Sequence, residues 1–338
     1  MAFQSAAFSP KEWSIGVAEE TTVGTAITSY LGIEAEGVSF PTVNDSVRIT
    51  EKRLSSTGRV VNEGDLINYE PGGIHEFSVS GILTTELLAT LVENAMGAEV
   101  SSDIVMVDYN HNPVSFLHGV GSSGAHNTVA FCIEGPAGGP NDSYTMKGCV
   151  ITSLTLSANA NEEGGRFKFD LTAQSRTPIV TTAVAQSTNT IAAYTENFKN
   201  LGIFTQDKSI NGVATVLESI SVTIENPVAF LGNTGSTPEG YQRSIPGFTA
   251  TADCVVKYDA NTNVFLQHWR GQTVATPKGL YLANNTSFAS ATDFGIKMDN
   301  VIVAEQPTFD EGDFMKVNCK LLSVSDETDS EVLAICVA

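Results

Sequence analysis

Hydrophobic and polar residues alternate with a period of two along much of this chain. A period of two places successive side chains on opposite faces of a β-strand. The pattern therefore predicts strands with one packed face and one polar face, as in antiparallel sheets that meet water on one side. The clearest apolar runs are Phe77 and Val79; Val150, Thr152, Leu154 and Leu156; and Phe167, Phe169 and Leu171.

Two segments instead show the spacing of an amphipathic helix. The first runs from Thr84 to Gly97, with Thr84 or Thr85 as the N-cap and Gly97 as the stop. The second runs from Asp259, as the cap, to Gly271, as the stop. The apolar stripes are Leu87, Leu88, Leu91, Val92 and Met96 in the first, and Val264, Phe265, His268 and Trp269 in the second.

The second half of the chain resembles the first. Residues 146–151 resemble residues 296–301, and Glu163–Leu171 resembles Glu311–Cys319 with an offset of 311 − 163 = 148 residues. In both copies a strand leads into an acidic turn with Gly and returns as a strand with Lys in the same phase. This is the pattern of a β-hairpin in which Gly supplies the positive φ.

The elements upstream of these hairpins also recur in order. A strand led by Gly72 or Gly247 precedes each helix, and a long loop precedes each strand. We predict a tandem duplication, with chance similarity between β segments as the alternative. The predicted parts are a first domain over residues 1–176, with an N-terminal arm 1–32 and a long loop 44–70; a linker 177–201; and a second domain 202–338.

The charge of the chain narrows the possible partners. There are 18 Lys and Arg against 38 Asp and Glu, a formal net charge of −20. Such a chain is expected to repel phosphate backbones and anionic membranes, which argues against a sequence reader of DNA. The five cysteines form no CxxC motif and are expected to be buried, reduced thiols. We expect no signal peptide and no membrane span.

No catalytic motif stands out, so neither an enzyme nor a cofactor is predicted. A metal site is conceivable at His111, His118 and His126 with Cys132 or Asp108, but no pair has tight ligand spacing. The Gly-rich segment 135–140 lacks the Lys-Ser/Thr pair of a phosphate-binding loop. His268 is expected to pack in the core. The adjacent carboxylates Glu19–Glu20 and Glu162–Glu163 are expected in solvated turns.

A cluster of charges lies in the first long loop. Four cations are followed by three carboxylates: Arg48, Lys52, Arg53 and Arg59, then Glu63, Asp65 and Glu70. One interpretation is an exposed loop of mixed charge. The other is an arm that docks on acidic surface of another copy, since complementary charge sets register between partners.

The segment Trp13–Ala26 resembles the opening of phage tail tube proteins. It reads WSIGVAEETTVGTA, and the family often begins with a phrase of the type I-G-x-x-x-E-T-T-x-G-T-A, followed by a strand and a charged loop. The specific match covers these fourteen residues. A looser match in the order of elements covers most of the chain.

The resemblance implies a fold and a function. The fold would be mainly β with two short helices, as tandem tail-tube-like β-sandwich or barrel domains that close into a ring-shaped β-barrel on oligomerisation. The chain would polymerise into stacked rings in the phage tail, assembled in the host cytoplasm. Its partners would be itself and the tail terminator, tape measure and tail-tip proteins. Genomic DNA would pass through without specific binding.

Ring size and channel lining follow from the duplication. Single-domain members close a ring with six copies, so a duplicated chain needs three; six chains with an outer decoration domain are the alternative. The polar faces of the two hairpins are candidates for the wall of the channel. Their residues are Lys168, Asp170, Lys316 and Asn318. The rival functions are a capsid-decorating or tail-terminator protein, and a β-sandwich adhesin, which would need an export signal.

Overall fold

The computed structural model describes twenty-three stretches of the chain, and the account below concerns these residues. They are 13–25, 27–42, 46–48, 69–71, 74–97, 109–110, 128–135, 143–162, 165–176, 180–182, 190–192, 208–210, 213–214, 216–230, 241–243, 248–259, 263, 269–270, 279–283, 294–298, 300–311, 314–324 and 332–337, the single residue 263 and the short pairs included.

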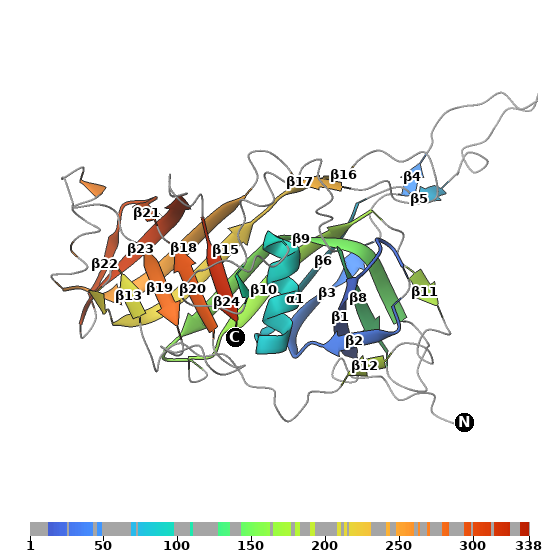
Figure 1. Cartoon of the computed structure of the whole chain (residues 1–338), viewed down its shortest axis with the longest axis horizontal. Helices are drawn as coiled ribbons and strands as arrows, with labels where there is room; N and C mark the ends of the chain where they lie inside the picture. Colours follow the sequence, from blue (N-terminus) through green and yellow to red (C-terminus); the bar gives the residue numbers. More distant parts are fainter. Residues whose placement is uncertain are drawn as a thin grey trace, which may run out of the picture.

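One long antiparallel sheet runs through both halves of the chain (Figure 1). Each strand in it is hydrogen-bonded to the next, and β21 and β22 both lie along the far side of β23. The strands of this long sheet are, in order, β3 (Ala35–Thr42), β6 (His75–Ile82), β10 (Lys168–Ser175), β9 (Ser143–Asn159), β15 (Leu217–Glu225), β18 (Thr249–Lys257), β23 (Met315–Val324), and then β21 (Asn300–Val303) with β22 (Thr308–Glu311).

Each half adds a second layer, named here the first and second cover sheet. The long strand β9 belongs to two layers, since its first part pairs with β8 and its last part with β10. The first cover sheet contains β12 (Thr190–Ala192), β2 (Ser29–Gly32), β1 (Ser14–Glu20), β8 (Thr128–Glu134), β9 and β11 (Val180–Thr182). The second contains β14 (Val213–Ala214), β13 (Lys208–Ile210), β19 (Leu280–Ala283), β20 (Phe294–Met298), β24 (Ala334–Val337) and β7 (Tyr109–Asn110).

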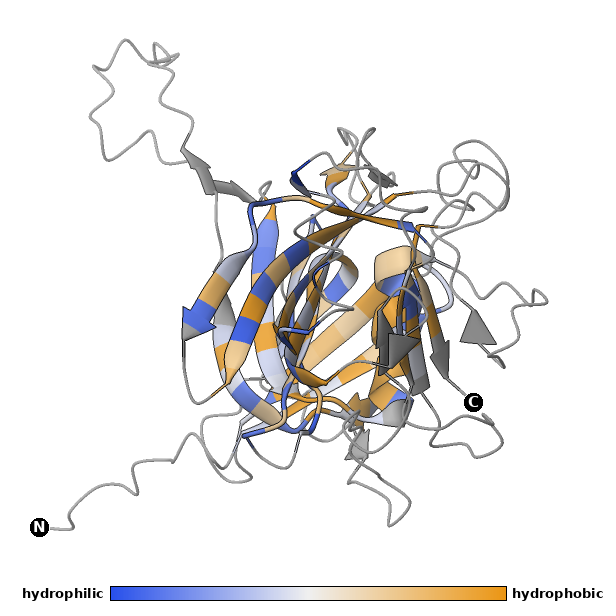
Figure 2. Cartoon of the chain, turned by 90° about the vertical axis from the view of Figure 1, so that its left-hand side faces the viewer, coloured by the Kyte–Doolittle hydropathy of each residue, from blue (hydrophilic) through white to orange (hydrophobic). Residues whose placement is uncertain are grey.

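The core lies between these layers and is continuous across both halves. Phe77 of the long sheet meets Phe131 of the first cover sheet, with ring centroids 4.9 Å apart. The predicted alternation is confirmed in β6 and β10, where every second residue is buried. Figure 2 shows the resulting alternation of hydrophilic and hydrophobic residues along the strands.

The predicted face of β9 is wrong at its centre. Ile151 joins the core together with Leu154 and Leu156, while Thr152 does not. The register with β10 shifts at this point, because Ala173 pairs with Ile151 and Thr172 pairs with Ser153. A β-bulge inserts one residue and reverses the phase of alternation.

The first predicted helix is confirmed as α1 (Thr85–Met96). Thr84 is the N-cap, and its side chain accepts a hydrogen bond from Leu87 N at 3.4 Å. Gly97 ends the helix with φ 128°, a positive value that favours glycine. The apolar stripe of α1 is buried. No helix in the described part of the chain is long and apolar enough to cross a membrane.

Most of the second predicted helix, including His268, lies outside the described residues. Asn263 N donates to Asp259 O at 3.1 Å, which is the spacing of one helical turn. Trp269 was expected on the buried stripe, but its exposed fraction is 44%. The prediction for Trp269 is therefore wrong, and α1 is the one complete helix in the described part of the chain.

The two halves pair their strands in the same order. In the long sheet, β3-β6-β10-β9 corresponds to β15-β18-β23-β22. In the cover sheets, β2-β1-β8-β9-β11 corresponds to β14-β13-β19-β20-β24. The first half uses one strand, β9, where the second half uses β20, β21 and β22 in succession. Two strands, β11 and β12, lie in the segment 177–201 that was expected to be a linker.

A short ribbon interrupts each half at the same place. The ribbon of β4 (Ser46–Arg48) and β5 (Tyr69–Pro71) lies between β3 and β6 in the sequence. The ribbon of β16 (Val228–Phe230) and β17 (Tyr241–Arg243) lies between β15 and β18. Both lie at the upper side of the molecule in Figure 1. The register of β6 with β10 puts the hairpin turn after β9 at the opposite end, since Lys168 pairs with Ile82.

Candidate assembly surface

The polar face of the long sheet is continuous across both halves. A row of facing residues runs from Lys168 to Ser157, Ser221, Asp253 and Lys320 on five successive strands. The wall candidates all lie on this face: Lys168 and Asp170 on β10, and Lys316 and Asn318 on β23. The register between strands, which the sequence did not predict, brings the two pairs onto one surface.

Three lysines on this face are paired with carboxylates. Lys168 Nζ lies 3.0 Å from Glu36 Oε2, and Lys316 Nζ lies 2.5 Å from Glu218 Oε2. Lys320 Nζ lies 2.8 Å from Glu305 Oε1, and this hydrogen bond raises the pKa of Lys320 above its ordinary value. The side chains are partly exposed, so each pair contributes little to folding. Its larger effect is to reduce the positive charge that the face presents.

The first two ion pairs occupy equivalent places in the two halves. Glu36 is the extra residue of a bulge in β3, because Ala35 pairs with Gly81 and Gly37 with Ser80. Glu218 is the extra residue of a bulge in β15, because Leu217 pairs with Val256 and Ser219 with Val255. A bulge turns one side chain out of the regular alternation. In both halves that side chain reaches a lysine two strands away.

Hydrogen bonds at the strand ends repeat as well. Ile82 N donates to Glu34 O at 3.1 Å, and Lys257 N donates to Val216 O at 3.0 Å. Leu83 N donates to Phe167 O, and Tyr258 N donates to Met315 O, both at 2.9 Å. These pairs relate the halves residue by residue, with offsets of 216 − 34 = 182, 257 − 82 = 175 and 315 − 167 = 148.

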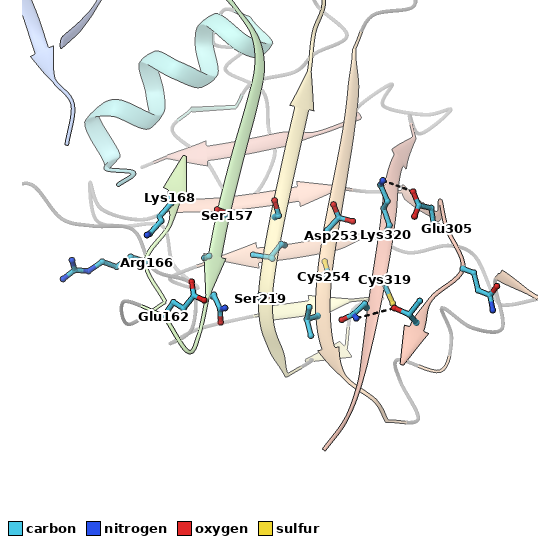
Figure 3. A pocket seen from close by; sticks show the side chains of 18 residues that line it. Ser157, Glu162, Arg166, Lys168, Ser219, Asp253, Cys254, Glu305, Cys319 and Lys320 are labelled. Carbon is cyan, nitrogen blue, oxygen red and sulfur yellow. Dashed lines mark hydrogen bonds and ion pairs between the residues drawn. The ribbon is translucent and has the colours of Figure 1, made fainter. Parts of the chain in front are cut away.

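A hollow of about 450 Å³ lies on the polar face where the two halves join. Figure 3 shows Lys168, Ser157, Ser219, Asp253 and Lys320 along its wall, from five neighbouring strands. The lining mixes both signs of charge with hydroxyl groups. No group of three or more His, Cys, Asp and Glu in the described residues is placed to hold a metal ion.

The halves are joined edge to edge by β9 and β15. Seven antiparallel residue pairs form the join, from Asn159 with Ser219 to Ser153 with Glu225. Thr155 Oγ1 and Thr223 Oγ1 lie 3.1 Å apart across it. The long sheet then ends at β3 on one side and at β21 and β22 on the other, since in the described residues these strands pair on one side only.

Helix α1 strengthens this join. Asn226, which follows β15, donates from Nδ2 to Ala95 O at 2.9 Å and from its backbone N to Thr152 O at 2.9 Å. Asn94 Oδ1 accepts a hydrogen bond from Ile151 N at 2.7 Å. Buried amide groups of this kind stabilise a single arrangement, because breaking one leaves a polar group without water.

The charged loop is described only at its base. Arg48 lies in β4 opposite Tyr69, and Glu70 lies in β5 opposite Val47. The other loop candidates, Lys52, Arg53, Arg59, Glu63 and Asp65, lie outside the described residues. So do the metal candidates Asp108, His111, His118 and His126. Cys132 is buried in β8, and its sulfur accepts a hydrogen bond from Thr145 Oγ1 at 3.9 Å.

The cysteines with described side chains are buried and form no disulfide: Cys132, Cys149, Cys254 and Cys319. Burial raises the pKa of Cys319 to about 12 and raises the pKa of Cys149 and Cys254 further. These thiols therefore stay protonated at neutral pH and act as small apolar groups.

Glu20 was expected in a solvated turn, and this prediction is wrong. Its side chain is only 2% exposed, whereas Glu19 is exposed. Glu20 Oε2 accepts hydrogen bonds from Gly24 N at 3.2 Å, Thr128 Oγ1 at 2.5 Å and Gly148 N at 2.8 Å. The carboxylate thus ties the turn after β1 to β8 and β9. The motif of the opening segment contains Glu20, and it was the only signal that could have singled this residue out.

These observations define the chain as a β protein whose halves extend one sheet, with both edges of that sheet open in the described residues. The sequence profile of the phage tail tube protein family matches residues 14–309. The chain belongs to this family, so it is a structural protein of the virion, in the tail of a bacteriophage. A comparison with curated proteins found no match.

Proposed function

We propose that this tail tube subunit polymerises into stacked rings of three chains, which form the channel for DNA ejection into the host. The observation that carries the proposal is the β9–β15 join. This join connects two units that have the same strand order. The outer edge strands of the sheet, β3 and β22, are equivalent to the joined strands β15 and β9, respectively. A further copy added in the same way extends the sheet by another two units.

Ring closure removes the open edges. Open strand edges promote uncontrolled aggregation, and a closed barrel has none. Each chain offers eight strand positions, four per half, so three chains supply 3 × 8 = 24. At about 4.8 Å per strand the circumference is about 115 Å, or about 37 Å across before strand tilt widens it. A barrel of this size encloses an open channel.

The polar face suits a channel through which DNA slides. A lysine that contacts phosphate releases counterions and binds DNA in a salt-dependent way. Lys168, Lys316 and Lys320 are engaged by Glu36, Glu218 and Glu305. The net charge of −20 adds general repulsion. We assign the polar face of the long sheet to the lumen for this reason.

The remaining parts of the proposal concern the rest of the tail. The tube is assembled in the host cytoplasm, along the tape measure protein, between the tail tip and the tail terminator. The chief alternative within the virion is a terminator or capsid-decorating protein, which would cap or coat and would not form filaments. The alternative stoichiometry is six chains per ring, with the second half as an outer ornament. The shared pairing order of the halves favours three.

Electron microscopy of the purified protein tests the proposal. We expect stacked rings with threefold symmetry and pseudo-sixfold density in each ring. Six complete chains per ring would contradict the stoichiometry and the reading of the second half as a wall domain. A monomer that stays monomeric at high concentration, even with tail initiator present, would contradict the function itself.

A further inference from the structure

We infer that neighbouring copies in a ring meet through β22 of one copy and β3 of the next, antiparallel, with Asp310 opposite Ser39. This inference rests on the proposed function and deepens it by assigning the residues of the seam. The partner is a second copy of this chain. The internal β9–β15 join serves as the template, because it unites the strands that are equivalent to β22 and β3.

The register of the seam follows from the offsets between the halves. Lys168 pairs with Ser157 in the first half, and Lys316 pairs with Asp310 in the second, so Asp310 is equivalent to Ser157. Ser39 pairs with Ser78 and Ser221 pairs with Asp253, which makes Ser39 equivalent to Ser221 (221 − 39 = 182). Ser157 pairs with Ser221 in the internal join. The equivalent pair in the seam is therefore Asp310 with Ser39.

The hydrogen bonds of the internal join define the kind of pair. Ala160 N donates to Glu218 O, and Asn226 N donates to Thr152 O. Hydrogen-bonded pairs alternate with non-hydrogen-bonded pairs along an antiparallel ladder, so Ser157 and Ser221 form a non-hydrogen-bonded pair. Such pairs place Cα atoms about 4.5 Å apart. Asp310 and Ser39 inherit this geometry.

Three residues of β3 keep a constant relation to β15. Ala35, Gly37 and Ser39 pair with β6 as Leu217, Ser219 and Ser221 pair with β18, with an offset of 182 residues. The pairing of β3 with β6 shifts between Ser39 and Thr42, so the offset applies up to Ser39. Ser39 is therefore the residue of β3 that places the seam.

The exposure of Phe309 points to a missing neighbour. Its side chain is 41% exposed, although Phe309 faces the core side of β22 opposite the buried Val317. The equivalent residue of the first half is Leu156, which is 0% exposed because β15 flanks it. In the seam, β3 of the next copy would flank Phe309 as β15 flanks Leu156.

A disulfide across the seam tests the register. We combine Ser39→Cys with Asp310→Cys, assemble the protein, oxidise it mildly and separate the products by non-reducing electrophoresis. The expected result is a shift of the monomer band to a covalent trimer, since the Cα separation suits a disulfide. The matched control combines Ser157→Cys with Ser221→Cys, which places the same pair inside one chain and yields an internal disulfide without a trimer. Ser39→Cys with Thr308→Cys lies two residues out of register and is expected to cross-link less.

The outcomes separate the seam from the function. Threefold rings without a cross-link, under conditions in which the internal control oxidises, would overturn the register while leaving the tube intact. If the double variant does not assemble, the two single variants are mixed; assembled rings without cross-linked dimers would overturn the seam equally. Unmodified protein that forms no rings would reject the proposed function. The unmodified chain also controls for the native cysteines.

Discussion

Glu20 holds a carboxylate where the surrounding strands leave it almost no water. Three donors compensate part of the desolvation: the backbone N–H groups of Gly24 and Gly148 and the hydroxyl of Thr128. Desolvation is still the largest effect, and it raises the pKa of Glu20 above the usual value of 4.5. The residue therefore connects β1, β8 and β9 through polar contacts, at a cost that depends on pH.

Replacing Glu20 with Gln is expected to change the pH dependence of stability. A carboxyl group whose pKa is raised on folding favours the folded state fully below pH 4.5, and this advantage is lost as pH rises through the folded pKa. The Glu20→Gln variant lacks this loss, so its stability relative to the unmodified chain should improve as pH rises above 4.5. Denaturant unfolding of dilute, unassembled protein at several pH values measures this. Glu19→Gln, at the exposed neighbour, is the control; a stability difference independent of pH would contradict the assignment.

At the scale of elements, the two halves share the bulges that direct Glu36 and Glu218 toward lysines, but they differ in the strands that connect the two layers. Both halves have a bulge in their first strand of the long sheet, at Glu36 in β3 and at Glu218 in β15. In both, a short ribbon follows that strand in the sequence. The strand β9 crosses both layers in one piece, whereas the second half divides the same path among three strands. The ribbons leave one end of the long sheet, and the hairpin turns close the other. If all rings stack in the same direction, the ribbons of one ring meet the hairpin turns of the next ring.

Reversing the charge of the ribbon loop is therefore expected to weaken stacking. The variant carries Arg48→Glu, Lys52→Glu, Arg53→Glu and Arg59→Glu. Exposed charges guide and align two partners more than they stabilise a core. The thermal unfolding of the subunit should therefore change little, while the tubes become shorter. Electron microscopy and sedimentation measure the tubes. Neutralising Glu63, Asp65 and Glu70 in the same loop is the control, and an unchanged tube yield in the reversed variant would exclude the docking role.

At the scale of the whole molecule, the sheet gathers into one surface the ion pairs that each half builds separately. Three copies of the chain would present 3 × 3 = 9 paired lysines on the inner face of a ring. A surface of this kind excludes water from neither partner, so the pairs are weak and can exchange. What matters for DNA is that Lys168, Lys316 and Lys320 each have a carboxylate nearby to compete with phosphate.

Removing those carboxylates is expected to make the tube bind DNA. The variant carries Glu36→Gln, Glu218→Gln and Glu305→Gln, which leaves the three lysines without their partners. Each lysine that then contacts a phosphate should steepen the dependence of log K on log salt by about 0.9. Binding of duplex DNA to assembled tubes, titrated over a range of salt, measures this against Glu19→Gln with Glu86→Gln as the control. Tight, salt-sensitive binding by unmodified tubes would contradict the proposed lumen.

The amino-acid sequence by itself determined the local features of this protein. Alternation in β6 and β10, the cap and stop of α1, and the β9–β10 hairpin depend on residues close together in the chain. Gly165, in that hairpin turn, has the positive φ of 76° expected of a turn glycine. Local spacing controls such features because side-chain direction repeats every two or about four residues. The shared order of elements in the two halves was also visible in the sequence, and their tandem duplication stays a prediction.

Only the tertiary structure decided which edges meet and which charges pair. The β9–β15 join, the reach of Lys168 to Glu36 across β6, and the burial of Glu20 all depend on residues brought together from distant parts of the chain. The bulges that direct Glu36 and Glu218 break the alternation from which strands are predicted. The pattern along the chain indicates which face of each strand is apolar and which is polar. It does not indicate which strand pairs with which, because that depends on the edges that remain open when the other strands have paired.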